Sequence, residues 1–177
     1  MKKILIVIDM QKDFIDGSLG TREAVSIVPS VVKKMKSYSR DSIYATRDTH
    51  EENYLETQEG RNLPVPHCIR GIAGWQLHPE IEALVPADHI IDKPGFGSLE
   101  LAKRMKELAS EKEIEIELVG LCTDICVVSN AEILKAFLPE TIIRVDPSCC
   151  AGVTPEKHQA ALETMRSCQI MVEKTGL

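Results

Sequence analysis

The stretch Ile4-Leu5-Ile6-Val7-Ile8-Asp9 decides the fold class, because it is a continuous apolar run that ends in an acid. Such a run is typical of a strand that is buried on both faces of a sheet. Outward from it, strand-like and helix-like patterns alternate along the chain. Strands are expected at 4–8, 42–47, 89–92, 113–119, 141–145 and 169–172, and helices at 21–38, 98–109, 123–138 and from 154. The alternation predicts the α/β class, with three layers and helices on both faces of a six-stranded, mostly parallel, doubly wound sheet.

Length and composition narrow the possible functions. The 177 residues predict a single domain over 1–177, with a long irregular segment at about 48–87. A net charge of −6 without a basic cluster argues against a nucleic-acid partner. The first apolar run stops at Asp9, too early for a signal peptide or a membrane span, and no other stretch approaches membrane length. Six cysteines without the spacing of a disulfide framework predict reduced thiols and a cytoplasmic protein.

One predicted strand differs from the others. Glu113-Ile114-Glu115-Ile116-Glu117 alternates strictly between acidic and apolar residues. Such alternation favours a strand with one face in water over a central one. We therefore expect this strand to mark an exposed edge of the sheet.

Residues that can carry chemistry follow the predicted strands. Ligands of such sheets bind outside the carboxyl ends of the strands. Asp9 follows the first strand, Asp48 and His50 the second, Lys93 the third, and Cys126 lies shortly after the fourth. Thr123 is a good N-cap, which would place Cys126 in the first turn of a helix. Free N–H groups and the helix dipole there would favour the thiolate, the nucleophilic form.

Asp9, Lys93 and Cys126 could form a base, a cation and a nucleophile. A carboxylate beside a thiol can take its proton and later return it to a leaving group. A lysine between them keeps the carboxylate charged and favours the thiolate. Taken singly, each residue has an ordinary alternative, as a capping carboxylate, a solvated lysine and a core thiol. Their joint position at adjacent strand ends favours the catalytic interpretation.

A second group of residues could hold a metal ion. Asp48 and His50 lie two positions apart, and Glu59 and His67 follow in the irregular segment. One carboxylate with two imidazoles suits zinc, iron or manganese and leaves coordination positions open. The spacing is not diagnostic, since histidines in loops are more often surface groups. Phe14 and Trp75 could line an apolar pocket near Asp9, or belong to the core.

Three motifs resemble the isochorismatase-like cysteine hydrolases, and within them the nicotinamidase branch. They are Val7-Ile8-Asp9-Met10-Gln11-Lys12-Asp13-Phe14, Lys93-Pro94-Gly95-Phe96-Gly97-Ser98 and Gly120-Leu121-Cys122-Thr123-Asp124-Ile125-Cys126-Val127. The resemblance runs in order over nearly the whole chain. It implies an Asp9–Lys93–Cys126 triad and an oxyanion hole formed by the N–H groups of Cys122 and Cys126. It also implies a cis peptide bond between Leu121 and Cys122.

The same resemblance implies one divalent metal ion, zinc with iron or manganese as alternatives. The implied ligands are Asp48, His50 and His67, with Glu59 as the fourth. The expected pocket residues are Phe14, Leu19 and Trp75. Members of this branch usually carry an aromatic residue three positions before the second metal histidine, and Pro64 stands there in this chain.

The expected function is a cysteine amidohydrolase that converts nicotinamide to nicotinate and ammonia through a thioester. The expected partner is thus a small-molecule amide, and a homo-oligomer is expected by analogy with the family. Three alternatives stay open: hydrolysis of another small amide, ureide or carbamoyl compound, isochorismate hydrolysis, and a non-catalytic binding module. The metal ligands argue against isochorismate hydrolysis, which does not need them.

Overall fold

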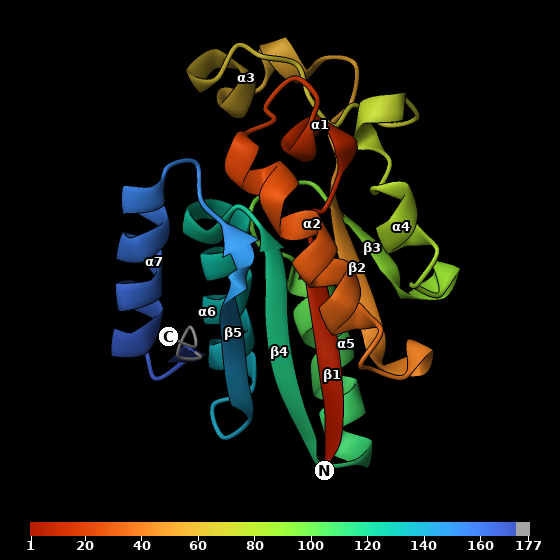
Figure 1. Cartoon of the computed structure of the whole chain (residues 1–177), viewed down its shortest axis with the longest axis vertical. Coiled ribbons are helices and arrows are strands. Elements are labelled where there is room, and N and C mark those ends of the chain that lie inside the picture. The colour runs from red at the N-terminus through yellow and green to blue at the C-terminus, as the bar shows by residue number, and fades with distance from the viewer. Residues whose placement is uncertain (173–177) are drawn as a thin grey trace.

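The computed structural model describes residues 1–172, which form a six-stranded sheet covered by helices (Figure 1). The strand order is β3-β2-β1-β4-β5-β6, and all neighbouring strands are parallel. The predicted doubly wound α/β class is confirmed. The strands are β1 (Lys2–Ile8), β2 (Ile43–Asp48), β3 (Ile90–Lys93), β4 (Ile114–Leu121), β5 (Ile142–Ala151) and β6 (Met171–Val172).

Strand β1 shows why the chain packs in three layers. Ile4, Ile6 and Ile8 belong to the core on one face of the sheet. Leu5 and Val7 belong to the core on the other face. Side chains alternate between the faces of a strand, so an uninterrupted apolar run requires cover on both sides. All five side chains are completely buried.

The helices divide between these two cores. Residues of α2 and α4 pack in the core that contains Leu5 and Val7. Residues of α5, α6 and α7 pack in the core that contains the isoleucines of β1. Figure 1 shows α2 in front of the sheet, with α5 and α6 behind it. The helices are α1 (Lys12–Ile15), α2 (Arg22–Met35), α3 (Gln58–Asn62), α4 (Pro79–Glu82), α5 (Leu99–Glu111), α6 (Val128–Phe137) and α7 (Pro155–Ser167).

Side-chain caps begin the three longest helices where the sequence predicts them. The hydroxyl of Thr21 accepts a hydrogen bond from the Ala24 N–H at 3.0 Å. Ser98 caps α5 and Thr154 caps α7 in the same way. Each cap satisfies a backbone donor that the helix itself leaves unpaired.

The expectation of an exposed edge at 113–117 is wrong. Strand β4 pairs with β1 on one side and β5 on the other, and Glu115 and Glu117 are each only 6% exposed. Lys34 at the end of α2 lies 2.6 Å from Glu117, and Arg144 on β5 pairs with Glu115. The charges are buried because cations from other elements neutralise them. This strand offers no free edge for pairing with a second copy, so the prediction of a homo-oligomer rests on the family analogy alone.

The first part of the segment between β2 and β3, which contains α3, lies above the carboxyl ends of the strands (Figure 1). Figure 1 shows α3 from this segment at the same end of the molecule as α1. Short 3₁₀ turns at Tyr54–Glu56, Ala73–Trp75 and Ala87–His89 complete it. All six cysteines are free thiols, as predicted. Within 1–172, no helix has the length and apolarity needed to cross a membrane.

Candidate active site

The fold brings the predicted triad together at the carboxyl ends of the strands. Asp9 follows β1, Lys93 ends β3, and Cys126 lies in the turn after β4. The ammonium Nζ of Lys93 lies 2.7 Å from Asp9 Oδ2 and 3.4 Å from Cys126 Sγ. All three side chains are buried, with Cys126 the most exposed at 5%. One ammonium therefore bridges a carboxylate and a thiol in a site largely closed to water.

Thr46 on β2 holds the carboxylate of Asp9. Its hydroxyl donates to Asp9 Oδ1 at 2.6 Å, while the Asp9 N–H donates to the Thr46 carbonyl at 3.2 Å. Asp9 has a positive φ of 46°, a left-handed conformation that Asp tolerates better than most residues. Oδ1 is engaged by Thr46, whereas Oδ2 faces Lys93. The sequence contained no signal for the role of Thr46, which depends on the pairing of β1 with β2.

Lys93 carries its charge despite being buried. Burial alone would lower its pKa, but Asp9, Cys126 and Asp48 outweigh this and raise the pKa well above its ordinary range. Its Nζ also donates to the Gly95 carbonyl at 2.9 Å. The ammonium is thus held in position, and its raised pKa favours the charged form near neutral pH.

The protonation of Cys126 differs from the expectation of a thiolate. Burial raises the pKa of the thiol well above its usual range, the nearby Asp9 raises it further, and Lys93 only partly offsets these effects. Burial also raises the pKa of Asp9, while Lys93 opposes that shift. Removal of the charged sulfur from water is the largest of these effects. The free site therefore keeps a proton on the thiol.

The turn that carries Cys126 also differs from the predicted cap. Residues Thr123–Val127 form a π-helical turn that precedes α6, and the N-cap is Cys122. The N–H groups of Ile125 and Val127 both donate to the Cys122 carbonyl, which widens the turn. Thr123 does not cap it, because its buried hydroxyl bonds to His158 Nδ1 at 2.8 Å. The expected cis peptide bond joins Leu121 to Cys122.

Asn130 ties this turn to the loop after Lys93. Its Nδ2 donates to the carbonyls of Cys126 and Phe96, at 2.8 and 3.1 Å. Its Oδ1 accepts from the Ser98 N–H at 2.9 Å. The side chain is 1% exposed, and these three contacts use both of its N–H donors and one acceptor position of its oxygen. Sequence reasoning missed this residue, since a single Asn inside a helix pattern carries no signal.

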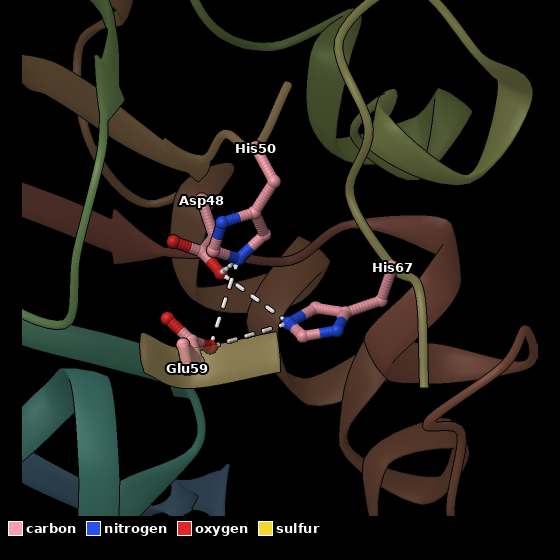
Figure 2. Close-up of side chains that lie close together, drawn as sticks. All are labelled: Asp48, His50, Glu59 and His67. Atoms are coloured by element: carbon pink, nitrogen blue, oxygen red, sulfur yellow. Dashed lines mark hydrogen bonds and ion pairs between the residues drawn. The ribbon is translucent and has the colours of Figure 1, made fainter. Parts of the chain in front are cut away.

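The four predicted metal ligands converge beside the triad. Figure 2 shows the side chains of Asp48, His50, Glu59 and His67 pointing toward one point. One ligand atom from each lies within 4.8 Å of all the others, and no second such group occurs within residues 1–172. His50 Nε2 lies 3.1 Å from Asp48 Oδ2, and His67 Nε2 lies 3.7 Å from the same oxygen.

These residues fit a divalent ion. Ligand atoms around a tetrahedral ion with bonds of roughly 2.1 Å lie about 3.4 Å apart, close to the observed separations. Glu59 Oε1 lies 3.6 Å from His50 Nε2 and 3.7 Å from His67 Nε2. His67 Nδ1 is 2.8 Å from the Val65 carbonyl, so the ring directs its other nitrogen toward the cluster. Two imidazoles and two carboxylates are a donor set suited to zinc or iron.

A cavity of about 630 Å³ connects the Cys126 thiol with three of the four candidate metal ligands, Asp48, Glu59 and His67. The predicted pocket residues Phe14 and Leu19 line it, together with Cys122 and Cys126. Apart from these residues and the metal ligands, the residues that line the cavity were not predicted from the sequence, although Phe96 and Ile125 lie within the quoted motifs. Those remaining lining residues are Thr21, Ala24, Gln58, Asn62, Leu63, Phe96, Ile125, Val153 and Lys157.

Trp75 does not line this cavity, so its prediction as a pocket residue is wrong. Its ring lies under the guanidinium of Arg47, 3.8 Å from the ring centroid, and its Nε1 donates to Thr49 at 2.9 Å. This cation–π contact and hydrogen bond hold the indole against the strand-end loops. Pro64 is also absent from the lining, where the phenyl rings are those of Phe14 and Phe96.

Comparison with known proteins agrees with this geometry. The isochorismatase domain family matches residues 3–175. The chain belongs to the isochorismatase family. An isochorismatase family protein from Bacillus subtilis is 30% identical over 178 residues, which cover 92% of this chain and 93% of that protein.

Two solved structures have the same fold. A nicotinamidase/pyrazinamidase from Bacillus subtilis matches with a TM-score of 0.81 and 28% identity, over 98% of this chain and all of that one. A Pyrococcus horikoshii pyrazinamidase, solved in complex with zinc, matches with a TM-score of 0.79 and 28% identity, over 99% of this chain and all of that one. The isochorismatase-family fold therefore extends over nearly the whole chain.

Proposed function

We propose that this isochorismatase-family protein is a cysteine amidohydrolase that converts nicotinamide to nicotinate and ammonia. The observation that carries the proposal is the position of Lys93 Nζ, in contact with both Asp9 and Cys126. Beside it, a four-residue metal cluster opens into the same cavity. The names of its relatives, nicotinamidase and pyrazinamidase, support a pyridine or pyrazine carboxamide as substrate.

The first step transfers a proton and forms a bond. Asp9 accepts the thiol proton of Cys126, and the sulfur attacks the carboxamide carbon. The high pKa of the resting thiol means that the thiolate forms as the attack proceeds. Lys93 stabilises the negative charge wherever it lies, because its ammonium touches both partners. Lys93 thereby lowers the barrier to thiolate formation, although the resting enzyme holds Cys126 as the neutral thiol.

The second stage releases ammonia and then the acid. The N–H groups of Cys122 and Cys126 would hold the tetrahedral oxyanion, where one donor is worth about 2.7–4 kcal/mol. As the C–N bond breaks, protonated Asp9 gives its proton to the departing nitrogen. A water molecule, deprotonated by Asp9, then attacks the thioester carbon, the C–S bond breaks, and Asp9 returns the proton to the Cys126 sulfur, which releases the acid and restores the thiol. The sum is one amide and one water converted to one acid and one ammonia.

Asp48, His50, Glu59 and His67 would hold one divalent ion, with zinc supported by the Pyrococcus horikoshii relative solved with zinc. When bound, the ion supplies a Lewis acid that can orient a ring nitrogen or a water molecule. Phe14 would help to position the amide, because its ring packs against that of His67 with ring centroids 5.5 Å apart. This aromatic wall would hold a flat heterocycle between the metal cluster and Cys126.

The cavity also favours a second candidate, hydrolysis of a larger or differently shaped amide. Without an aromatic residue at Pro64, leucine and valine side chains form part of the wall. A volume of about 630 Å³ is of the size that accommodates drug-like ligands, which are larger than nicotinamide. Lys157, which lines the cavity, could form an ion pair with an anionic substituent of such a substrate.

The homo-oligomer and the cytoplasmic location expected from the sequence stay predictions.

A turnover assay tests the proposal. Ammonia release is measured with nicotinamide, pyrazinamide and a panel of small amides, ureides and carbamoyl compounds, with bound metal quantified on the same sample. Cys126→Ala should abolish turnover, whereas Cys168→Ala, which changes an exposed cysteine, serves as the matched control. Normal ammonia release by Cys126→Ala would contradict the mechanism. Turnover of another amide but not nicotinamide would favour the second candidate.

A further inference from the structure

Asp13 is a buried carboxylate outside both the triad and the metal cluster. It lies in α1 and is 8% exposed. Its Oδ2 accepts a hydrogen bond of 2.8 Å from the N–H of Cys68, which is 55 positions away in the chain. It forms no ion pair with any residue of 1–172. Burying a carboxylate without a cationic partner costs folding free energy, so the buried position of Asp13 requires an explanation.

The partner of Asp13 directly follows a predicted metal ligand. Cys68 comes after His67, is completely buried and has a positive φ of 48°. A residue with a side chain adopts this left-handed conformation only when its surroundings hold it there. The Cys68 carbonyl accepts from the His50 N–H at 3.0 Å. The two peptide groups of Cys68 thus connect Asp13 with the backbone of both histidines.

The carboxylate has little freedom to move. A Cβ atom at Gly74 would overlap both oxygens of Asp13, and one at Gly17 would also collide with the side chain. Backbone therefore encloses the carboxylate from two sides. An oxygen held this firmly can fix the direction of the Cys68 N–H, and with it the backbone from which the His67 ring projects.

We propose that Asp13 is a positioning residue that sets the orientation of the metal ligand His67 through its hydrogen bond to Cys68. The inference rests on the metal site of the proposed function. Its chemistry resembles that of a carboxylate that orients a ligating imidazole, but it acts through the backbone. The alternative is that Asp13 only anchors α1 to the loop, in which case the metal site would not depend on it.

The test measures metal affinity in purified, metal-free protein. Zinc binding is determined by competition with a chromophoric chelator, and the visible spectrum of bound Co²⁺ reports the ligand arrangement. Asp13→Ala should weaken zinc binding by roughly 10- to 100-fold and change the Co²⁺ spectrum. Asp13→Asn keeps an acceptor oxygen and should retain affinity within a few-fold. Asp16→Ala removes the same charge from an exposed position just after α1 and should bind as the wild type does.

A second variant reaches the same hydrogen bond without touching Asp13. Gly74→Ala should displace the carboxylate and weaken zinc binding, although every proposed ligand is intact. Circular dichroism and thermal unfolding of the metal-free forms confirm that each variant is folded at the assay temperature. If Asp13→Ala does not fold, the comparison of Gly74→Ala with Asp13→Asn decides.

Wild-type zinc affinity in Asp13→Ala, or in Gly74→Ala where the alanine variant does not fold, would overturn the inference. Equal losses in Asp13→Ala and Asp13→Asn would also overturn it, because the acceptor would then not matter. Failure of the proposed function looks different: the wild type would itself bind no zinc or would hydrolyse no amide.

Discussion

The Asp9→Asn substitution should make Cys126 more reactive toward an alkylating agent. The same substitution should strongly reduce catalysis. Burial and the Asp9 carboxylate both raise the pKa of the thiol, and Lys93 lowers it. Asn has nearly the shape of Asp but no charge, so the repulsion disappears and the attraction to Lys93 stays. The pKa of Cys126 should therefore fall, and more thiolate should be present near neutral pH.

The distances set the size of the effect. Lys93 Nζ lies 2.7 Å from Asp9 Oδ2 and 3.4 Å from Cys126 Sγ, so the carboxylate and the sulfur are within about 6 Å of each other. Two unit charges at that distance repel by about 3 kcal/mol at an effective dielectric constant of roughly 20. Relief of this repulsion would increase the thiolate population about 100-fold. A less basic thiolate is less nucleophilic, which leaves a rate increase of roughly tenfold.

The assay follows iodoacetamide alkylation by intact mass, with peptide mapping to assign Cys126. Both proteins carry Cys168→Ala, because Cys168 is exposed and would otherwise react first. Amide turnover by Asp9→Asn should fall about 10²- to 10⁴-fold, since the general base is lost. Alkylation that is unchanged or slower in Asp9→Asn would refute the reasoning. The carboxyl group would then already hold the proton in the resting enzyme.

Three further predictions concern stability, the pocket and the metal. Lys34→Met should destabilise the protein by about 2–3 kcal/mol in denaturant unfolding, because it leaves Glu117 and Asp146 buried without this ammonium, which itself is 21% exposed. Burial alone would raise the pKa of Asp146, but the hydrogen bond from Lys34 outweighs it and lowers the pKa. The stability that the Asp146 carboxylate contributes is therefore fully present above its unfolded pKa of 3.8 and is lost as the pH falls through its lower pKa in the folded protein. In Lys34→Met, the free energy of unfolding should depend less steeply on pH in this acidic range. Trp75→Ala should leave the KM for the amide unchanged within about twofold, because the indole lies outside the cavity; a large rise in KM would contradict this placement. Glu59→Gln should weaken zinc binding about tenfold or more without changing Cys126 alkylation, and an unchanged zinc affinity would show that Glu59 is not a ligand.

The order of the elements and the fold class could be predicted from the sequence because they depend on local patterns. The apolar run Ile4–Ile8 requires cover on both faces, and caps such as Thr21 and Ser98 act within one helical turn. The meeting of Asp9, Asp48 and Lys93 follows almost directly, since parallel strands end at one edge of the sheet. The predicted group of four metal ligands likewise converges in space, although their spacing alone was not diagnostic.

Burial and charge were decided only by the tertiary structure. The alternating glutamates of β4 are typical of an exposed strand, yet Lys34, 83 positions from Glu117, neutralises that residue in the interior. The helix start at Cys126 indicates a thiolate, yet desolvation and Asp9 keep the thiol protonated. The sequence by itself determined which residues lie at the strand ends. Their protonation depends on what distant elements place beside them, because Coulomb energies and desolvation depend on distance and water access, not on order along the chain.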